Sequence, residues 1–248
     1  MILTSELSCG GATTEERIGR LSSVSLRRVI EPDLEILGNV GPGQVVADDL
    51  LSIAGMDITL DADQRAKLAR EEVAAITQMG VVLEGLLTAA LGVYVAEHPN
   101  LADPRVTYAL HEIGEESRHS RLFARLVAQI APEAKNPFGG RAGRAFQRWI
   151  VRSMQRDRLL MAILVLAGEE IPDLIQQRSL ASPDTDPFLR HVNQYHRQEE
   201  ARHVAFARLL LSEFWVSASR RQRRRARRLA PFLIRGLFEI LVHPGVYK

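Results

Sequence analysis

The sequence predicts an all-α protein whose centre is a four-helix bundle. No stretch alternates apolar and polar residues with period two, which is the pattern of a half-buried strand. Apolar residues instead recur at helical spacing over four long segments, which prolines and Asp-Pro pairs separate. The pentapeptide Glu-Glu-x-Arg-His also occurs twice, at residues 115–119 and 199–203. Two Glu-x-x-His pairs on separate helices, with one Glu from each of two more helices, form the dinuclear metal site of some four-helix bundles.

The composition is that of a soluble globular protein. Hydrophobic residues make up 46% of the chain and charged residues 25%, and the net charge of +2 argues against the whole chain binding a polyanion. The sole cysteine, Cys9, excludes a disulfide framework and a cysteine-based metal site, so we expect a cytoplasmic location. The N-terminus lacks the apolar segment of a secretory signal. The most apolar stretch, residues 159–167, is shorter than the ~20 residues that cross a bilayer, so we expect no membrane span.

The N-terminal 60 residues are expected to lie outside the bundle. Residues 1–20 are small and polar and include Gly10, Gly11 and Gly19, so we expect a disordered leader. Residues 21–60 carry scattered proline and glycine, and we expect an irregular arm that packs on the bundle. Residues 21–248 are interpreted as a single domain.

Two long helices should follow the arm. The first is predicted over residues 61–98, where Asp61 or Asp63 can cap its start and Pro99 follows its end. The second is predicted over residues 104–131, where an Asp-Pro pair opens the helix. The link between the two helices is short, so they should be antiparallel neighbours.

Two further core helices and a helical tail complete the prediction. The third helix is expected over residues 141–181, and Pro172 should kink it or end its first part. A second Asp-Pro pair opens the fourth helix, over residues 187–214. Helices are also expected over residues 217–243, where Pro231 separates a charged segment from an apolar one. That apolar segment exceeds what one bundle needs to cover itself, so we expect a homodimer.

Each of the four core helices carries an acid in an apolar setting. A carboxylate buried there without a partner would be costly, and two metal cations would supply the compensating charge. Carboxylate with imidazole suits iron or manganese, although the same ligand types also bind zinc. Single Glu-x-x-His pairs are common on solvated helix faces, but two pairs with acids on the other helices favour a metal site. The candidates are Glu84, Glu116 with His119, Glu169 or Glu170, and Glu200 with His203.

Several neighbouring residues are also candidates. His196 stands one turn before Glu200, on the same helix face, and beside this motif we favour it as a third histidine ligand over an ordinary core or surface histidine. Glu112 occupies the corresponding position in the first motif copy and is expected around the ligands. Glu115 and Glu199 could hydrogen-bond the ligand imidazoles, or could be ordinary surface acids.

The arginine-rich residues 220–228 allow two interpretations. They could contact nucleic acid, an anionic membrane or an acidic reductase. We favour a solvated helix face that balances acids elsewhere, and we expect no nucleic-acid partner.

The motifs His-x-x-x-Glu-x-Arg-His at residues 196–203 and Glu-Glu-x-Arg-His at residues 115–119 resemble those of the AurF-type diiron N-oxygenases. The resemblance covers roughly residues 60–248. It implies a ferritin-like bundle with two iron ions, and members of the family oxidise aryl amines to nitro compounds. Glu169 matches the family spacing better than Glu170, which would then lie around the ligands. The implied ligands are Glu84, Glu116, His119, Glu169, His196, Glu200 and His203.

The expected function is therefore that of a non-haem diiron oxygenase that uses O2 to oxidise a small organic substrate, with N-oxygenation of an arylamine as the leading reaction. The alternatives are a diiron hydroxylase or desaturase-like oxidase acting on carbon, a ferritin-like iron-handling protein and a helical DNA-binding regulator. His196 favours the oxygenase, because ferroxidase centres are usually poorer in histidine. No flavin or nicotinamide fingerprint is evident, so the electron donor should be external.

Overall fold

The computed structural model describes residues 12–131 and 139–240 of the chain. Helices and turns account for its regular structure, and no strand occurs within these two ranges, which confirms the all-α prediction. The elements are α1 (Thr14–Arg27), α2 (Pro32–Glu35), the 3-10 helix η1 (Asp48–Leu50), α3 (Ala62–Ala96), α4 (Pro104–Ile130), α5 (Arg141–Arg156), α6 (Arg158–Ala181), α7 (Pro187–Ser217) and α8 (Arg220–Ile240).

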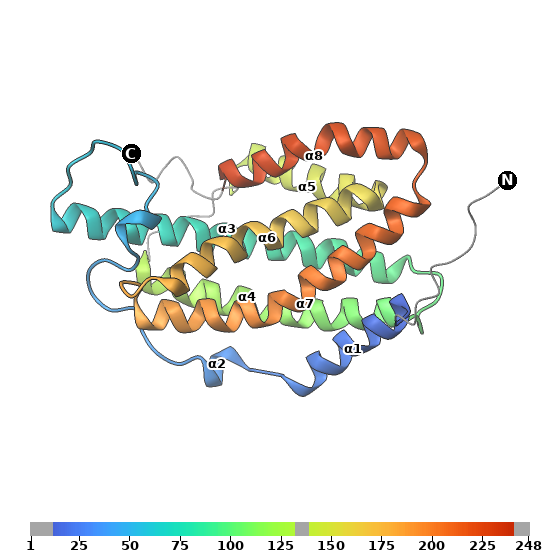
Figure 1. Ribbon diagram of the computed structural model, residues 1–248, viewed down its shortest axis with the longest axis horizontal. Helices are drawn as coiled ribbons and strands as arrows, with labels where there is room; N and C mark the ends of the chain where they lie inside the picture. Colours follow the sequence, from blue (N-terminus) through green and yellow to red (C-terminus); the bar gives the residue numbers. More distant parts are fainter. Residues whose placement is uncertain (1–11, 132–138, 241–248) are drawn as a thin grey trace.

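The four long helices α3, α4, α6 and α7 form the bundle (Figure 1). α3 packs along α4, and α6 packs along α7, whereas the contacts between these two pairs are much sparser. Helices α5 and α8 cover one side of the bundle, and α1 and α2 lie along the opposite side, against α4 and α7. The wider spacing between the two pairs leaves room for long side chains in the middle of the bundle.

The apolar core consists of two clusters, one towards each end of the bundle. One cluster joins residues 87–94 of α3 to residues 206–210 of α7 and includes Ile18 of α1. The other joins residues 69–74 of α3 to residues 122–130 of α4 and residues 188–195 of α7, and it includes Val45 and Leu51 of the arm. The predicted metal-binding side chains lie on the helix turns between these two clusters.

Side-chain caps explain where three of the core helices begin. Asp61 accepts the backbone N–H of Gln64 in a capping box, Asp103 accepts that of Arg105, and Asp186 accepts those of Phe188 and Leu189. Each carboxylate satisfies N–H groups that have no partner within the helix. These starts agree with the predicted ones to within a residue.

The third predicted helix is divided, and at a different place from the one expected. The helix ends at Arg156 and restarts at Arg158, because Asp157 adopts an extended backbone and its side chain caps the new helix through the N–H of Leu160. Pro172, where a kink or an end was expected, does not end the helix: it lies inside α6, which continues to Ala181. Pro231 likewise lies inside α8 and does not separate two tail helices. Residues 241–243 lie outside the described residues.

The prediction of a disordered leader over residues 1–20 is wrong from residue 14 onwards. Thr13 and Glu16 form a capping box that starts α1, in which Ile18 is fully buried. Residues 1–11 lie outside the described part of the chain. The arm expected over residues 21–60 is helical up to Arg27, and beyond it is irregular apart from the short helices α2 and η1. Arg125 of α4 holds the arm on the bundle by donating to the carbonyl groups of Pro32 and Ile36.

α3 is the one helix of the described residues that is long and apolar enough to cross a membrane, by length and composition alone. Residues 159–167 lie in α6, which does not pass this test. Core helices of bundles pass the same test, and α3 packs along α4 and carries the buried acids Glu72 and Glu84. We interpret α3 as a core helix.

The buried face of α1 should stabilise the bundle. We expect Ile18→Ala to lower the free energy of unfolding by roughly 2–5 kcal/mol, because the substitution leaves a cavity in a fully buried cluster. Leu26→Ala on the same helix, where the side chain is 67% exposed, should change it by about 0.5 kcal/mol or less. Urea denaturation measures both values. Equal, small effects would show that α1 does not pack on the bundle in solution.

Candidate metal centre

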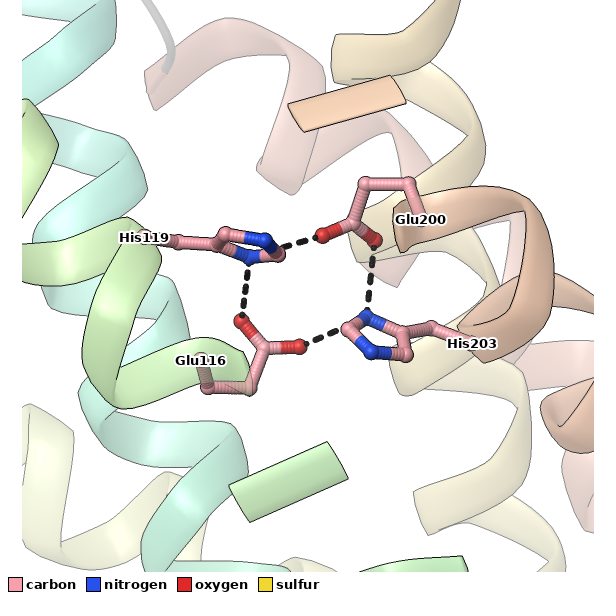
Figure 2. Close-up of side chains that lie close together, drawn as sticks. All are labelled: Glu116, His119, Glu200 and His203. Carbon is pink, nitrogen blue, oxygen red and sulfur yellow. Dashed lines mark hydrogen bonds and ion pairs between the residues drawn. The ribbon is translucent and has the colours of Figure 1, made fainter. Parts of the chain in front are cut away.

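Two acids and two histidines form a closed ring in the middle of the bundle (Figure 2). The i, i+3 spacing places Glu116 and His119 on one face of α4, and Glu200 and His203 on one face of α7. Nδ1 of His119 lies 3.5 Å from Glu116 Oε2 and 3.2 Å from Glu200 Oε1. Nδ1 of His203 lies 3.0 Å from Glu116 Oε1 and 3.3 Å from Glu200 Oε2. Both acids thus face both imidazoles across the gap between the helices.

The outer nitrogen of each imidazole contacts an acid of the opposite helix. Nε2 of His119 lies 2.9 Å from Glu199 Oε2, and Nε2 of His203 lies 2.7 Å from Glu115 Oε2. The expectation that Glu115 and Glu199 hydrogen-bond the imidazoles agrees with this geometry. Because each outer acid holds Nε2, the Nδ1 atom of each ring is left to face the centre of the ring of four residues.

The arginine of each motif copy supports the outer acid of the other copy. Arg202 donates to Glu115 Oε1 at 2.8 Å, and Arg118 Nη2 lies 3.5 Å from Glu199 Oε1. Tyr195 also donates to Glu199, at 3.0 Å. The roles of these three residues were not predicted from the sequence, although the arginine recurs in both copies of the pentapeptide.

Glu84 and His196 extend the cluster towards α3 and α6. Nε2 of His196 lies 3.4 Å from Glu84 Oε1 and 3.2 Å from Glu200 Oε1. Ser120 donates to the other oxygen of Glu84 at 2.7 Å, and Nδ1 of His196 lies 3.0 Å from the side-chain oxygen of Gln176. Donor atoms of Glu84, His119 and His196 lie within 4.8 Å of one another, so they form a second group that could hold a metal ion.

The two adjacent acids of α6 have different environments. Glu169 faces the cluster, within hydrogen-bonding reach of the Glu200 carboxylate, but it lies outside both groups of close donor atoms. Glu170 is exposed and pairs with Arg208 at 2.5 Å, so the expectation that it lies around the ligands is wrong. The helical rotation of about 100° per residue turns the second acid away from the bundle when the first faces inwards.

Glu112 is buried next to the cluster without a partner. Neither of its carboxylate oxygens has a hydrogen bond within the described residues. Burial raises the pKa of Glu112 to about 8, against the lowering effect of the His203 charge. Glu112 therefore lies near the site, as expected. Its side chain makes no hydrogen bond that would orient a metal ligand.

Burial and neighbouring charges have opposite effects on the pKa values of the clustered acids and histidines. Burial raises the pKa of Glu84 to about 7. Burial would also raise the pKa of Glu115, but the hydrogen bond to His203 and the charges of His203 and Arg202 outweigh it and lower that pKa to about 2. For His119 and His203, burial opposes protonation, yet the surrounding carboxylates raise both imidazole pKa values well above their usual range. In this arrangement protons on the imidazoles offset the negative charge of the carboxylates.

The donor set fits a pair of metal cations. Carboxylate oxygens and imidazole nitrogens are the usual ligands of non-haem iron, and here they come from all four bundle helices. Both oxygens of Glu116, Oε1 of Glu200 and Nδ1 of His119 are buried without a directed hydrogen bond within the described residues. Such unsatisfied atoms are costly unless a cation or water contacts them.

The arginine-rich residues 220–228 lie on α8, away from the cluster, and most of their side chains are exposed. Arg223 donates to the carbonyl groups of Trp215 and Val216, and the guanidinium group of Arg227 lies 5.2 Å from the ring centre of Trp215. These contacts fix the start of α8 against the end of α7.

Similar proteins occur in mycobacteria. The chain is 30% identical over 176 residues to an uncharacterized protein of Mycobacterium bovis and to uncharacterized proteins of two strains of Mycobacterium tuberculosis. The match covers 69% of this chain and 50% of each relative, so the chain spans about half the length of these relatives. No solved structure matches it. Residues 12–248 match the family model described as P-aminobenzoate N-oxygenase AurF, and the chain therefore belongs to the AurF family.

Proposed function

We propose that this protein is a diiron oxygenase that uses O2 to oxidise a small organic substrate, and that the reaction is N-oxygenation of an amine. The observation that carries the proposal is the crossed ring of Glu116, His119, Glu200 and His203, joined to Glu84 and His196 at the wall of an apolar cavity. Membership of the AurF family supports the same reaction class.

Seven side chains would hold the metal ions. Iron bound there would supply the redox chemistry by which O2 is reduced and the substrate oxidised. Imidazole and carboxylate also accept manganese, and iron is the metal that the family resemblance favours. The proposed ligands are Glu84, Glu116, His119, Glu169, His196, Glu200 and His203.

The surrounding residues would hold the ligand imidazoles in the orientation that metal binding needs. Glu115 and Glu199 accept hydrogen bonds from Nε2 of the two motif imidazoles and so direct Nδ1 inwards. Arg202 and Arg118 contribute to keeping these outer acids ionised, since their charges lower the acids' pKa values. The apolar clusters at both ends of the ring exclude water from the bundle core.

Several expectations from the sequence stay predictions. These are the homodimer, the external electron donor, the cytoplasmic location and the choice of iron over manganese. The expected absence of a nucleic-acid partner and of a membrane span also remains to be tested.

Loss of an outer acid should weaken metal binding without removing a ligand. We expect Glu115→Gln to lower the affinity for ferrous iron by about 10–100-fold, because the amide no longer fixes the His203 ring as a carboxylate does. Glu170→Gln is the matched control, since Glu170 is exposed and pairs with Arg208. Competition with a chromophoric chelator measures the affinity of both variants. Equal affinity of Glu115→Gln and wild type would remove the positioning role of Glu115.

Turnover with O2 tests the proposed function directly. The full chain, loaded anaerobically with ferrous iron and supplied with reductant, should convert members of an arylamine panel to products that carry added oxygen on nitrogen. Mass spectrometry with ¹⁸O2 identifies the source of that oxygen. Iron oxidation without any organic product would instead favour the iron-handling alternative, and oxygen on carbon would favour a hydroxylase.

His196→Ala separates an oxygenase from a generic ferritin-like protein. If His196 holds iron, its loss opens a position in the cluster, so O2 should still be consumed while product per O2 falls. Stopped-flow absorbance after mixing with O2 and the product yield are compared with wild type. Superimposable traces with equal yield would place His196 outside the metal centre.

A further inference from the structure

A cavity of about 530 Å³ lies between α3, α5, α6 and α8. Glu84, Glu169 and His196 form part of its wall, so the cavity reaches the candidate metal centre. Its volume lies in the range that encloses a drug-sized ligand, and a small arylamine such as p-aminobenzoate would leave much of it unfilled. The volume of the cavity therefore favours a substrate larger than a single substituted ring.

Apolar side chains from all four helices line this cavity. α3 supplies Leu83 and Leu87, and α6 supplies Leu160 and Leu164. On α5 the rings of Phe146 and Trp149 stack with 5.9 Å between their centres, and both line the cavity. α8 supplies Leu229, Phe232 and Leu233. Hydrocarbon placed along these walls would leave water for an apolar surface, which is favourable in proportion to the area buried.

The described lining of the cavity offers an anionic substrate no buried cationic side chain. Glu72, Glu84 and Glu169 carry the acidic groups of the described lining, and the Glu72 carboxylate already accepts the N–H and hydroxyl of Ser52. Arg225 is the one arginine of that lining, but its side chain is 59% exposed and its guanidinium group lies 3.7 Å from Asp157. His196 faces Glu84 and Glu200. Bound metal would offset the charge of Glu84 and Glu169, which are proposed ligands. Away from those ligands, a substrate carboxylate would lose its hydration without gaining a buried lysine or arginine partner in the described lining.

We propose that the cavity binds an amine that carries an extended apolar group and no carboxylate. The amine lies towards Glu84, Glu169 and His196, and the apolar group extends along α5 and α8. The inference rests on the proposed function, because it takes the cavity to be the substrate site of the same metal centre.

Direct binding to a series of arylamines tests this substrate class. The full chain, loaded anaerobically with ferrous iron, is dialysed to equilibrium against aniline, 4-butylaniline, 4-hexylaniline or p-aminobenzoate. Affinity should rise by up to about fourfold for each methylene that the cavity buries, and p-aminobenzoate should bind no better than aniline. A flat series, or p-aminobenzoate binding as tightly as 4-hexylaniline, would overturn the proposal.

Two neighbouring substitutions on α8 locate the apolar group. Leu233 lines the cavity, whereas Ile234 lies outside the lining and is partly exposed. Leu233→Trp should weaken binding of 4-hexylaniline by up to about 16-fold, the equivalent of roughly two buried methylenes, and leave aniline binding unchanged. Ile234→Trp should alter neither. Unchanged 4-hexylaniline affinity in Leu233→Trp, or an equal loss for both ligands, would contradict the assigned position.

The binding and turnover experiments can contradict the substrate class and the proposed function independently of each other. If 4-hexylaniline binds preferentially but yields no product with O2 and reductant, the substrate class stands and the proposed N-oxygenation falls. If p-aminobenzoate binds more tightly and is oxidised, the proposed function stands and the apolar substrate class falls.

Discussion

The burial of acids and imidazoles together, halfway along four helices, is the constraint on which the rest of the structure depends. An ionised carboxylate costs several kcal/mol to bury unless a cation or hydrogen-bond donor compensates it. Here Glu116 and Glu200 face His119 and His203, whose raised pKa values favour their protonated form. Metal cations would replace those protons, so binding of metal and release of protons are coupled in such a site.

The repeated pentapeptide works as a pair and not as two separate motifs. The inner acid and the histidine of each copy meet those of the other copy, while each outer acid and each arginine contacts a group on the opposite helix. This crossed arrangement fixes the register of α4 against α7, two helices that otherwise make few close backbone contacts. Apolar clusters above and below the ring exclude water, and a cavity reaches Glu84, Glu169 and His196 from one side.

Much of this was predictable because helical periodicity and capping are local properties. The Asp-Pro pairs at Asp103 and Asp186 located two helix starts, and the choice between Asp61 and Asp63 placed a third to within two residues. The three-residue spacing of each Glu-His pair placed both side chains on one helix face. The errors arose where tertiary packing decides. The segment around Ile18 is polar, yet it forms a helix whose Ile18 side chain is buried against the bundle. Pro172 and Pro231 lie inside α6 and α8, two helices that pack against each other. Neither the break at Asp157 nor the outward direction of Glu170 could be read without knowing which face of α6 is buried.

The central claim is that the ring of Glu116, His119, Glu200 and His203, together with Glu84, Glu169 and His196, holds two metal ions. Anomalous diffraction at the iron edge, from crystals of the full chain loaded anaerobically with ferrous iron, tests it most directly. The account predicts two iron peaks enclosed by the side chains of Glu84, Glu116, His119, Glu169, His196, Glu200 and His203, and their loss in the Glu116→Ala, Glu200→Ala double variant. Peaks only at the protein surface, or the same peaks in the double variant, would contradict it.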